Sequence, residues 1–294
     1  MLRRRSHDRN AGPGKARVNP QCLDSTGLPC NGRLRLLSFN IQVGISTEGY
    51  RHYLTRSWQH LLPHPGRAAN LQRIGEVLAN FDLVALQEAD GGSLRSNNVN
   101  QVEHLAQLGG FPYWYQQLNR NLGRLAQHSN GVLSRLKPTA LEDHPLPGPP
   151  GRGAILLRFG EGDEALAVVM MHLALGRKAR TRQLAYVREL IGGYRHQVLM
   201  GDMNTHASDL LEHSPLNDLG LIAPQVGGTF PSWRPQRCLD HILLSPSLTL
   251  ERVRVLPKPI SDHLPVAVEI RLPEHLDQDA QSQTTARQAC VALS

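Results

Sequence analysis

Residues 196–204 read HQVLMGDMN, in which an apolar run leads directly into an aspartate and an asparagine. An apolar run of roughly four to eight residues predicts a buried strand, and a polar side chain at its tip is held at the rim of the core. Five further apolar runs carry polar residues at one end. They are Asn40 after LRLLSF, Glu88 after LVALQ, His172 after AVVMM, Asp240 and His241 opening DHILL, and Asp262 and His263 in SDHLPV. Strands that converge would bring the six motifs into one cleft.

The residue types in these motifs suit the cleavage of a phosphate ester. Carboxylate and amide oxygens are the ligands that Mg²⁺ and Ca²⁺ prefer, whereas histidines exchange protons near neutral pH. Glu88 is the strongest metal candidate, because a carboxylate that ends the run LVALQ is costly to bury unless it is paired or bound to a cation. A salt bridge between Glu88 and an arginine is the alternative.

The motifs FNI, LQE, HL, GDMN, LDHIL and SDHLPV occur in this order, and together they resemble the endonuclease/exonuclease/phosphatase family, whose members share the fold of DNase I. The resemblance covers residues 33–272. The stretches SNGVLSR, GRGAILLRF, HLALGRKARTRQL and FPSWRP are similar to a group of small bacterial members, some of them encoded beside phospholipid-synthesising enzymes. The resemblance implies an α/β fold, a four-layer sandwich of two packed mixed β-sheets flanked by helices.

The resemblance also assigns roles to the residues of the motifs. Glu88, Asn40 and Asp262 are the expected metal site, with Asn40 either a ligand or a hydrogen-bond partner of the ligands. His263 is the expected essential imidazole, and Asp240 the carboxylate that orients it. Because neighbouring side chains of a strand point to opposite faces, Asp262 and His263 can serve one site only from the turn before the strand.

Further roles concern the attacking water and the phosphate. Asp202 is expected to orient or deprotonate the water. Asn204, two residues on and therefore on the same face of a strand, is expected to hydrogen-bond the phosphoryl group, unless it only closes an Asx turn. Gly201 lets the backbone approach closely. His172 either protonates the leaving oxygen or only shapes the pocket.

Substrate-binding residues are expected around the phosphate. They are Arg152 in GRGAI, Arg180 after HLALG and Asn130 in SNGVLS. Arginines there would stabilise the charge that develops in the transition state, although solvated surface decoration is the alternative for each of them. His241 is left out of the catalytic set.

Composition indicates one globular enzyme domain, and its charge makes binding to long duplex DNA less favoured without excluding a nuclease. The 294 residues are 40% hydrophobic, enough for a two-sheet core. The formal net charge is +7, of which residues 1–20 contribute +5, so the body is only mildly basic and has no extended lysine and arginine stripe.

The two ends are polar. We expect a basic leader over residues 1–32, the catalytic domain over 33–273 and a polar tail over 274–294. The leader is either solvated or in contact with acidic lipid or nucleic acid. No apolar segment after the arginines suggests a signal peptide, and no run is long enough to span a bilayer. The four cysteines form no CxxC pair, and they permit a reducing cytoplasm while leaving a Cys22–Cys30 bridge open. We expect a cytoplasmic monomer.

Apolar runs predict strands near 34–40, 83–88, 113–117, 130–134, 153–159, 165–172, 197–201, 239–244 and 264–270. Helical spacing predicts helices over 67–80 and 178–192.

The hypothesis that follows is a phosphodiesterase that uses Mg²⁺, or Mn²⁺ in its place, and in-line attack by water. A nuclease is favoured, a phospholipid- or inositol-phosphate-directed enzyme is the alternative, and an inactive binding module is the third. Two aromatic segments, 46–65 and Phe230 with Trp233, are expected to stack a base, to enter a lipid interface or only to cover the core.

Overall fold

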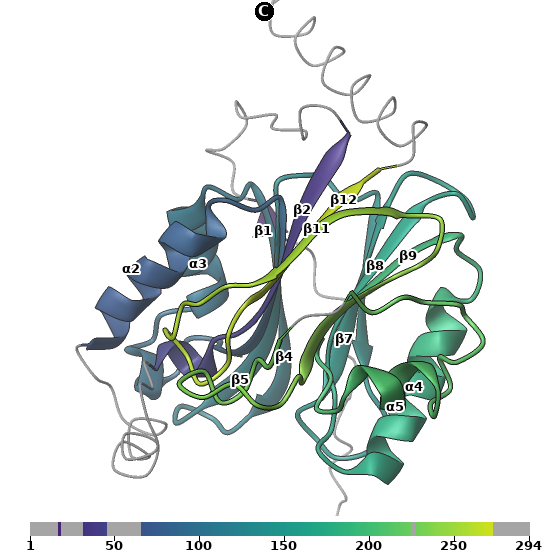
Figure 1. Ribbon diagram of the computed structural model, residues 1–294. Helices are drawn as coiled ribbons and strands as arrows, with labels where there is room; N and C mark the ends of the chain where they lie inside the picture. Colours follow the sequence, from purple (N-terminus) through teal and green to yellow (C-terminus); the bar gives the residue numbers. More distant parts are fainter. Residues whose placement is uncertain (1–16, 19–31, 46–65, 225–226, 273–294) are drawn as a thin grey trace, which may run out of the picture.

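Two β-sheets pack face to face in the computed structural model, and helices cover the outer face of each (Figure 1). The structure describes residues 17–18, 32–45, 66–224 and 227–272. The seven-stranded sheet has the order β1 (Arg17–Val18), β4 (Tyr113–Asn121), β5 (Gln127–Ser134), β3 (Leu83–Asp90), β2 (Arg33–Asn40), β12 (Val266–Arg271), β11 (Thr249–Val255). The five-stranded sheet has the order β10 (Asp240–Leu244), β9 (His196–Asp202), β8 (Leu166–His172), β7 (Gly153–Phe159), β6 (Ala140–Pro145).

The helices form the two outer layers. α2 (Gly66–Leu78) and α3 (Gln101–Gly109) lie on the seven-stranded sheet, and α4 (Arg177–Ile191) and α5 (Ala207–Leu211) lie on the five-stranded sheet (Figure 1). Two short 3-10 helices, η2 (Gln42–Gly44) and η4 (Leu94–Ser96), follow β2 and β3. The expected four-layer α/β sandwich is therefore confirmed.

Strands such as β3, β8 and β9 bury both of their faces, which explains their nearly continuous apolar sequences. Val168 and Met200 lie between the sheets, in the same cluster as Leu36 of the other sheet. The alternate residue Val169 packs outward, in a cluster with Leu184 of α4. Side chains alternate along a strand, so a strand between two apolar layers needs an apolar residue at almost every position.

The predicted strands and both predicted helices are present, with ends shifted by a few residues. Three longer elements were not predicted: β6, β11 and α3. Most of the leader and the whole of the tail lie outside the described residues, as do the aromatic segment 46–65 and Cys22, Cys30 and Cys290. Within the leader, Arg17 and Val18 pair with Trp114 and Tyr113 of β4. In the described part of the chain, no helix has the length and apolar character needed to cross a membrane.

Strand directions explain where the polar motifs meet. β2 and β3 run parallel in one sheet, and β8 and β9 run parallel in the other. Parallel neighbours end at the same edge of a sheet. Asn40 therefore lies opposite Gln87 in the first sheet, and His172 lies opposite Asp202 in the second.

Candidate active site

Three strands of the five-stranded sheet place a histidine and two carboxylates side by side. Asp202, the last residue of β9, pairs in register with His172 of β8 and with Asp240 of β10. Residues in register on neighbouring strands have side chains on the same face, so all three point to one side. Gly201 is required beside them, since a Cβ at its φ of +149° would lie 1.8 Å from the carbonyl oxygen of Met171.

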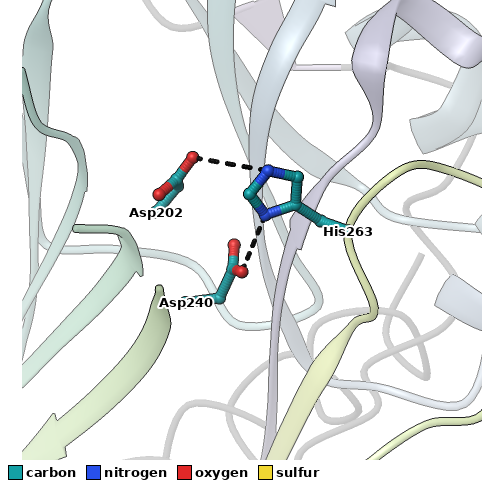
Figure 2. Close-up of side chains that lie close together, drawn as sticks. All are labelled: Asp202, Asp240 and His263. Carbon is teal, nitrogen blue, oxygen red and sulfur yellow. Dashed lines mark hydrogen bonds and ion pairs between the residues drawn. The ribbon is translucent and has the colours of Figure 1, made fainter. Parts of the chain in front are cut away.

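His263 lies between the carboxylates of Asp240 and Asp202 (Figure 2). Its Nδ1 is 2.8 Å from Asp240 Oδ2, and its Nε2 is 4.0 Å from Asp202 Oδ2. Burial alone lowers the pKa of His263, but the charges of Asp240, Asp202 and Asp262 outweigh it and raise the pKa to about 10. His263 is thus an imidazolium at neutral pH, with Nε2–H directed toward Asp202.

The SDH segment, residues 261–263, lies in the turn before β12, as expected, and the seven-stranded sheet and a neighbouring loop hold it there. Ser261 Oγ donates to the Asn40 carbonyl at 2.7 Å. The Ser232 backbone N–H donates to the Asp262 carbonyl at 2.7 Å, and the Phe230 ring lies 4.8 Å from the His263 ring, centroid to centroid. Phe230 therefore helps to position the imidazole.

Asp202 is buried among other charges. Its pKa is raised to about 7, first by burial and then by the charge of Asp240, and a hydrogen bond from Asn40 partly opposes the shift. That bond joins the two sheets, with Asn40 Nδ2 donating to Asp202 Oδ2 at 3.2 Å. A carboxyl group that titrates near neutral pH is suited to accept a proton from water.

Glu88 occupies a bulge in β3. Between Leu86 and Ala89 the pairing with β5 shifts register, and Glu88 has a φ of +55°. A left-handed conformation is unfavourable for a residue with a side chain, and such strain is found most often at functional sites. In the described part of the chain no lysine or arginine forms an ion pair with Glu88; the nearest partner is His172, at 4.0 Å. The structure therefore does not support the alternative of a salt bridge to an arginine.

Glu88 and Asp262 fit a divalent cation. The pKa of Asp262 is raised to about 6, mainly by burial and also by the charge of Glu88, while His263 opposes the shift. Two carboxylates that repel each other and lack an arginine or lysine partner among the described residues provide the hard oxygen ligands that Mg²⁺ prefers. Asn40 Oδ1 already accepts from the backbone N–H of Gln42 at 3.1 Å, so Asn40 is better suited to orient its neighbours than to serve as the main ligand.

A second group also has ligand geometry. One ligand atom each from Asp202, Asp240 and His263 lie within 4.8 Å of one another. However, Nδ1 of His263 is hydrogen-bonded to Asp240, and the pKa of the imidazole is raised to about 10, so the ring keeps its proton at neutral pH. A metal needs the neutral ring. This group is therefore suited to proton transfer, and Glu88 and Asp262 are the candidate cation ligands.

A buried aspartate that the sequence analysis did not select fixes the chain after Glu88. Asp90 accepts hydrogen bonds from the backbone N–H groups of Gly92 and Ser93 and from Arg95 Nε, the last at 2.5 Å. Burial raises the pKa of Asp90, but these bonds outweigh it and lower the pKa to about 2. The signal in the sequence was DGGSLRS, separated from LQE by Ala89, in which an aspartate precedes two glycines and an arginine.

His172 is held by Arg152, whose Nη1 contacts His172 Nε2. A guanidinium only donates, so Nε2 of His172 is the acceptor and the ring is neutral. Burial, followed by the charge of Arg152, keeps the pKa of His172 well below its usual range. The arrangement favours the alternative that His172 shapes the pocket over the expectation that it protonates the leaving oxygen.

Two further residues expected at the site, Asn204 and Asn130, are engaged in hydrogen bonds with the protein. The strand β9 ends at Asp202, so the expected alternation does not extend to Asn204, whose φ is +52°. Asn204 N donates to Asp202 Oδ1 at 3.0 Å, which is the Asx-turn alternative, and its Nδ2 donates to the Leu173 carbonyl at 2.9 Å. Asn130 lies beside Arg152 in a pocket, and its amide Nδ2 lies 3.4 Å from the carbonyl oxygen of Gly153.

Arg180 is not brought to this pocket. It lines a separate hollow, and its guanidinium donates to the carbonyls of Ala174 and Leu175. The arrangement is that of a residue that holds the loop after β8. His241 is buried, with Nε2 2.8 Å from the Thr205 carbonyl, which agrees with its exclusion from the catalytic set.

The sequence and the fold of the chain resemble those of known proteins. A model of the endonuclease/exonuclease/phosphatase family matches residues 37–263, and the curated proteins contain no match. Among solved structures, an endonuclease/exonuclease/phosphatase from Beutenbergia cavernae DSM 12333 is 21% identical, with a TM-score of 0.64 over 82% of this chain and 72% of that one. The mannosyl-6-phosphatase Bt3783 of Bacteroides thetaiotaomicron is 19% identical (TM-score 0.57; 81% and 99% covered). D. rerio TDP2 complexed with single strand DNA product is 16% identical (TM-score 0.59; 82% and 99% covered).

Proposed function

The chain belongs to the endonuclease/exonuclease/phosphatase family, whose members hydrolyse phosphate esters, and from that premise we propose that it is a divalent-cation-dependent phosphodiesterase that acts on nucleic acid. The observation that carries the proposal is the group formed by Asp240, His263 and Asp202, in which a protonated imidazole faces a carboxyl group of raised pKa. Glu88 and Asp262 lie beside this group as the candidate cation ligands.

Each residue has a definite task in this proposal. Mg²⁺ bound at Glu88 and Asp262 would supply Lewis-acid polarisation of a phosphoryl oxygen. Asp202 accepts the proton of the attacking water. His263, held by Asp240, donates from Nε2 to a phosphoryl oxygen and stabilises the charge of the transition state. Arg152 adds positive charge on the other side of the phosphate.

Nucleic acid is the substrate that we favour. The pocket beside Glu88 is lined by Arg120, Arg152 and His128, which suits a chain of phosphates. The structural neighbour D. rerio TDP2 was solved with a single strand DNA product, and the present fold is similar to it.

A phospholipid-directed enzyme is the second candidate, because exposed leucines flank this pocket. Leu122 and Leu125, at the turn between β4 and β5, are 45% and 64% exposed, and Arg120 and Arg124 lie beside them in the sequence. Apolar side chains next to arginines suit the surface of an anionic bilayer.

The test is hydrolysis of plasmid DNA, short single strands, phospholipids and small phosphomonoesters, with Mg²⁺ and with EDTA. We expect Mg²⁺-dependent cleavage of DNA. Cleavage of lipid alone would support the second candidate, and no hydrolysis of any substrate would support an inactive binding module. Single strands cleaved equally well in EDTA would contradict the cation dependence.

Glu88→Gln tests the cation site. We expect activity to fall at least ~100-fold, as for loss of a metal ligand or its support. We also expect Mg²⁺ to raise the melting temperature of the unaltered chain but not that of the variant. Glu76→Gln, on the exposed face of α2, is the matched control and should behave like the unaltered chain. Full Mg²⁺-dependent activity in Glu88→Gln would refute the assignment.

A further inference from the structure

A pocket of about 250 Å³ opens beside the catalytic group. Glu88 and Arg152, which the proposed reaction already uses, line it together with His172. Its lining also includes Arg120 and His128, from the ends of β4 and β5, and the proposed reaction gives neither of them a catalytic task. The volume is below the range of roughly 300–1,000 Å³ for drug-sized ligands, so the pocket suits a small part of a substrate.

A second β-bulge directs Arg120 into this pocket. Leu118 pairs with Ser129 and Arg120 pairs with His128, so β4 has one residue more than β5 at this point, namely Asn119. Tyr115 of β4 and Val132 of β5 point into the apolar layer between the sheets, so alternation along β4 places Gln116 and Leu118 on the other face. Without the bulge, Arg120 would share that face with Leu118. The extra residue turns it to the face of His128.

The loop that carries Arg152 lies against the side chain of Arg120. Gly151, next to Arg152, has a φ of +89°, and a Cβ there would lie 3.6 Å from Arg120 Cβ and 3.8 Å from Arg120 Cδ. The aliphatic stem of Arg120 therefore passes close to the backbone of Gly151. Two guanidinium groups, from β4 and from the loop before β7, thus line one small pocket.

Within the part of the chain that the structure describes, neither Arg120 nor His128 has a protein partner for its polar atoms. Among the described residues, no carboxylate pairs with the guanidinium of Arg120, and no protein group hydrogen-bonds to the ring of His128. Other arginines of the chain are engaged, for example Arg95 with Asp90 and Arg135 with four backbone carbonyls. Burial, followed by the charges of Arg95 and Arg120, lowers the pKa of His128, so its neutral ring provides one N–H donor.

We propose that this pocket is a second phosphate subsite, in which Arg120 and His128 bind a phosphate that the substrate carries a few atoms away from the scissile one. The inference rests on the proposed function and narrows it to substrates that have two phosphates joined by a short link of sugar or glycerol size. A neighbouring phosphate of a nucleic acid and a phosphorylated glycerol headgroup share this chemistry. Arginine suits it because the guanidinium fork matches phosphate oxygens.

Binding by calorimetry in Mg²⁺ buffer tests the subsite in two series. One compares thymidine 3′,5′-bisphosphate with thymidine 5′-monophosphate, and the other compares glycerol 1,3-bisphosphate with glycerol 3-phosphate. We expect the bisphosphate to bind at least ~10-fold more tightly in one series, which then identifies the source of the phosphate. Arg120→Gln should remove this advantage, Arg120→Lys should restore part of it, and Arg73→Gln, on the exposed face of α2, should retain it.

Three results would overturn the subsite: equal binding of both members in both series, no binding of either bisphosphate, or an advantage that survives in Arg120→Gln. Hydrolysis of the p-nitrophenyl ester of thymidine 5′-phosphate is measured in parallel. Turnover without a bisphosphate preference would refute the subsite and keep the proposed function. A bisphosphate preference lost in Arg120→Gln, but without turnover of any ester, would refute the proposed function and keep the subsite.

Discussion

His263 is placed between two carboxylates, and this placement sets its protonation state. Asp240 contributes most of the favourable charge and also binds Nδ1, so that the proton available to a substrate is on Nε2. The imidazole lies 4.0 Å from Asp202, whose own pKa rises to about 7 because its burial and Asp240 outweigh the effect of His263. His263, an acid of high pKa, and Asp202, a base whose pKa is near neutrality, thus lie next to each other.

Asp240→Asn should therefore lower kcat at least ~100-fold, a loss typical of positioned proton-transfer groups. It should also move the alkaline limb of the pH profile. With Asp240 the imidazolium persists to a pKa of about 10; without its charge the pKa falls toward the ordinary value, so activity is lost at lower pH. Asp218→Asn, which alters an exposed pair with Arg188, is the control. An alkaline limb that does not move would contradict this role of Asp240.

Residue types were predictable from the sequence, but hydrogen-bond partners were not. Asp240 and His263 were expected to pair, and they do. The engagement of His172 by Arg152 depends on pairing between β7 and β8, and the bond from Asn40 to Asp202 joins residues 162 positions apart in the sequence. Such contacts arise from sheet packing, and local patterns of apolar and polar residues do not contain them.

At the scale of elements, the buried strands were predictable, including the edge strand β10, whereas the exposed edge strands β6 and β11 were not. β11 reads TLERVRV and β6 reads ALEDHP, and both are largely half-exposed strands at the ends of their sheets. Charged side chains protect sheet edges and thereby remove the apolar signal. The helix α3 had usable signals, since Asn100 caps its N-terminus and Gly110 ends it with a φ of +67°.

Bulges were the other unpredicted feature, and the catalytic geometry depends on them. Glu88 lies within one register shift and Arg120 follows another, both in strands that pair with β5. Directly after the bulge at Glu88, Asp90 accepts hydrogen bonds from Gly92, Ser93 and Arg95. The loop after β3 is therefore held by a buried charge rather than by apolar packing.

Asp90→Asn should destabilise the chain by about 3 kcal/mol, because it leaves Arg95 as an uncompensated buried charge. The free energy of unfolding in urea measures the effect. Arg188 and Asp218 form an ion pair at the surface, so Asp218→Asn should leave the stability nearly unchanged. Equal, small losses in both variants would show that the Asp90 network does not stabilise the loop.

At the scale of the whole molecule, the two sheets are stabilised by a central apolar layer, and the active site lies where polar strand ends of both sheets meet. Charged groups concentrate there at the cost of stability, since burial raises the pKa values of Asp202 and Asp262. Stability should therefore depend on pH through these few groups.

His263 dominates the pH dependence of the free energy of unfolding above neutral pH. The sign of this effect follows from the pKa values of His263 in the folded and in the unfolded state. The folded state holds the proton up to a pKa of about 10, whereas the unfolded chain releases it near about 6.5. Between these values the folded state binds more protons, so the free energy of unfolding falls as pH rises. His128, His172 and His241 have lowered pKa values and are neutral in both states by about pH 8.

The melting temperature in EDTA should thus decrease steadily between about pH 7.5 and 9, and His263→Gln should remove most of that decrease. Scanning fluorimetry at several pH values measures both slopes. The variant is expected to remain folded, because the turn before β12 is also held by the bonds of Ser261 and Ser232. A melting temperature that stays constant over this range in the unaltered chain, or an identical decrease in His263→Gln, would show that the imidazolium between Asp240 and Asp202 is not the group that couples folding to pH.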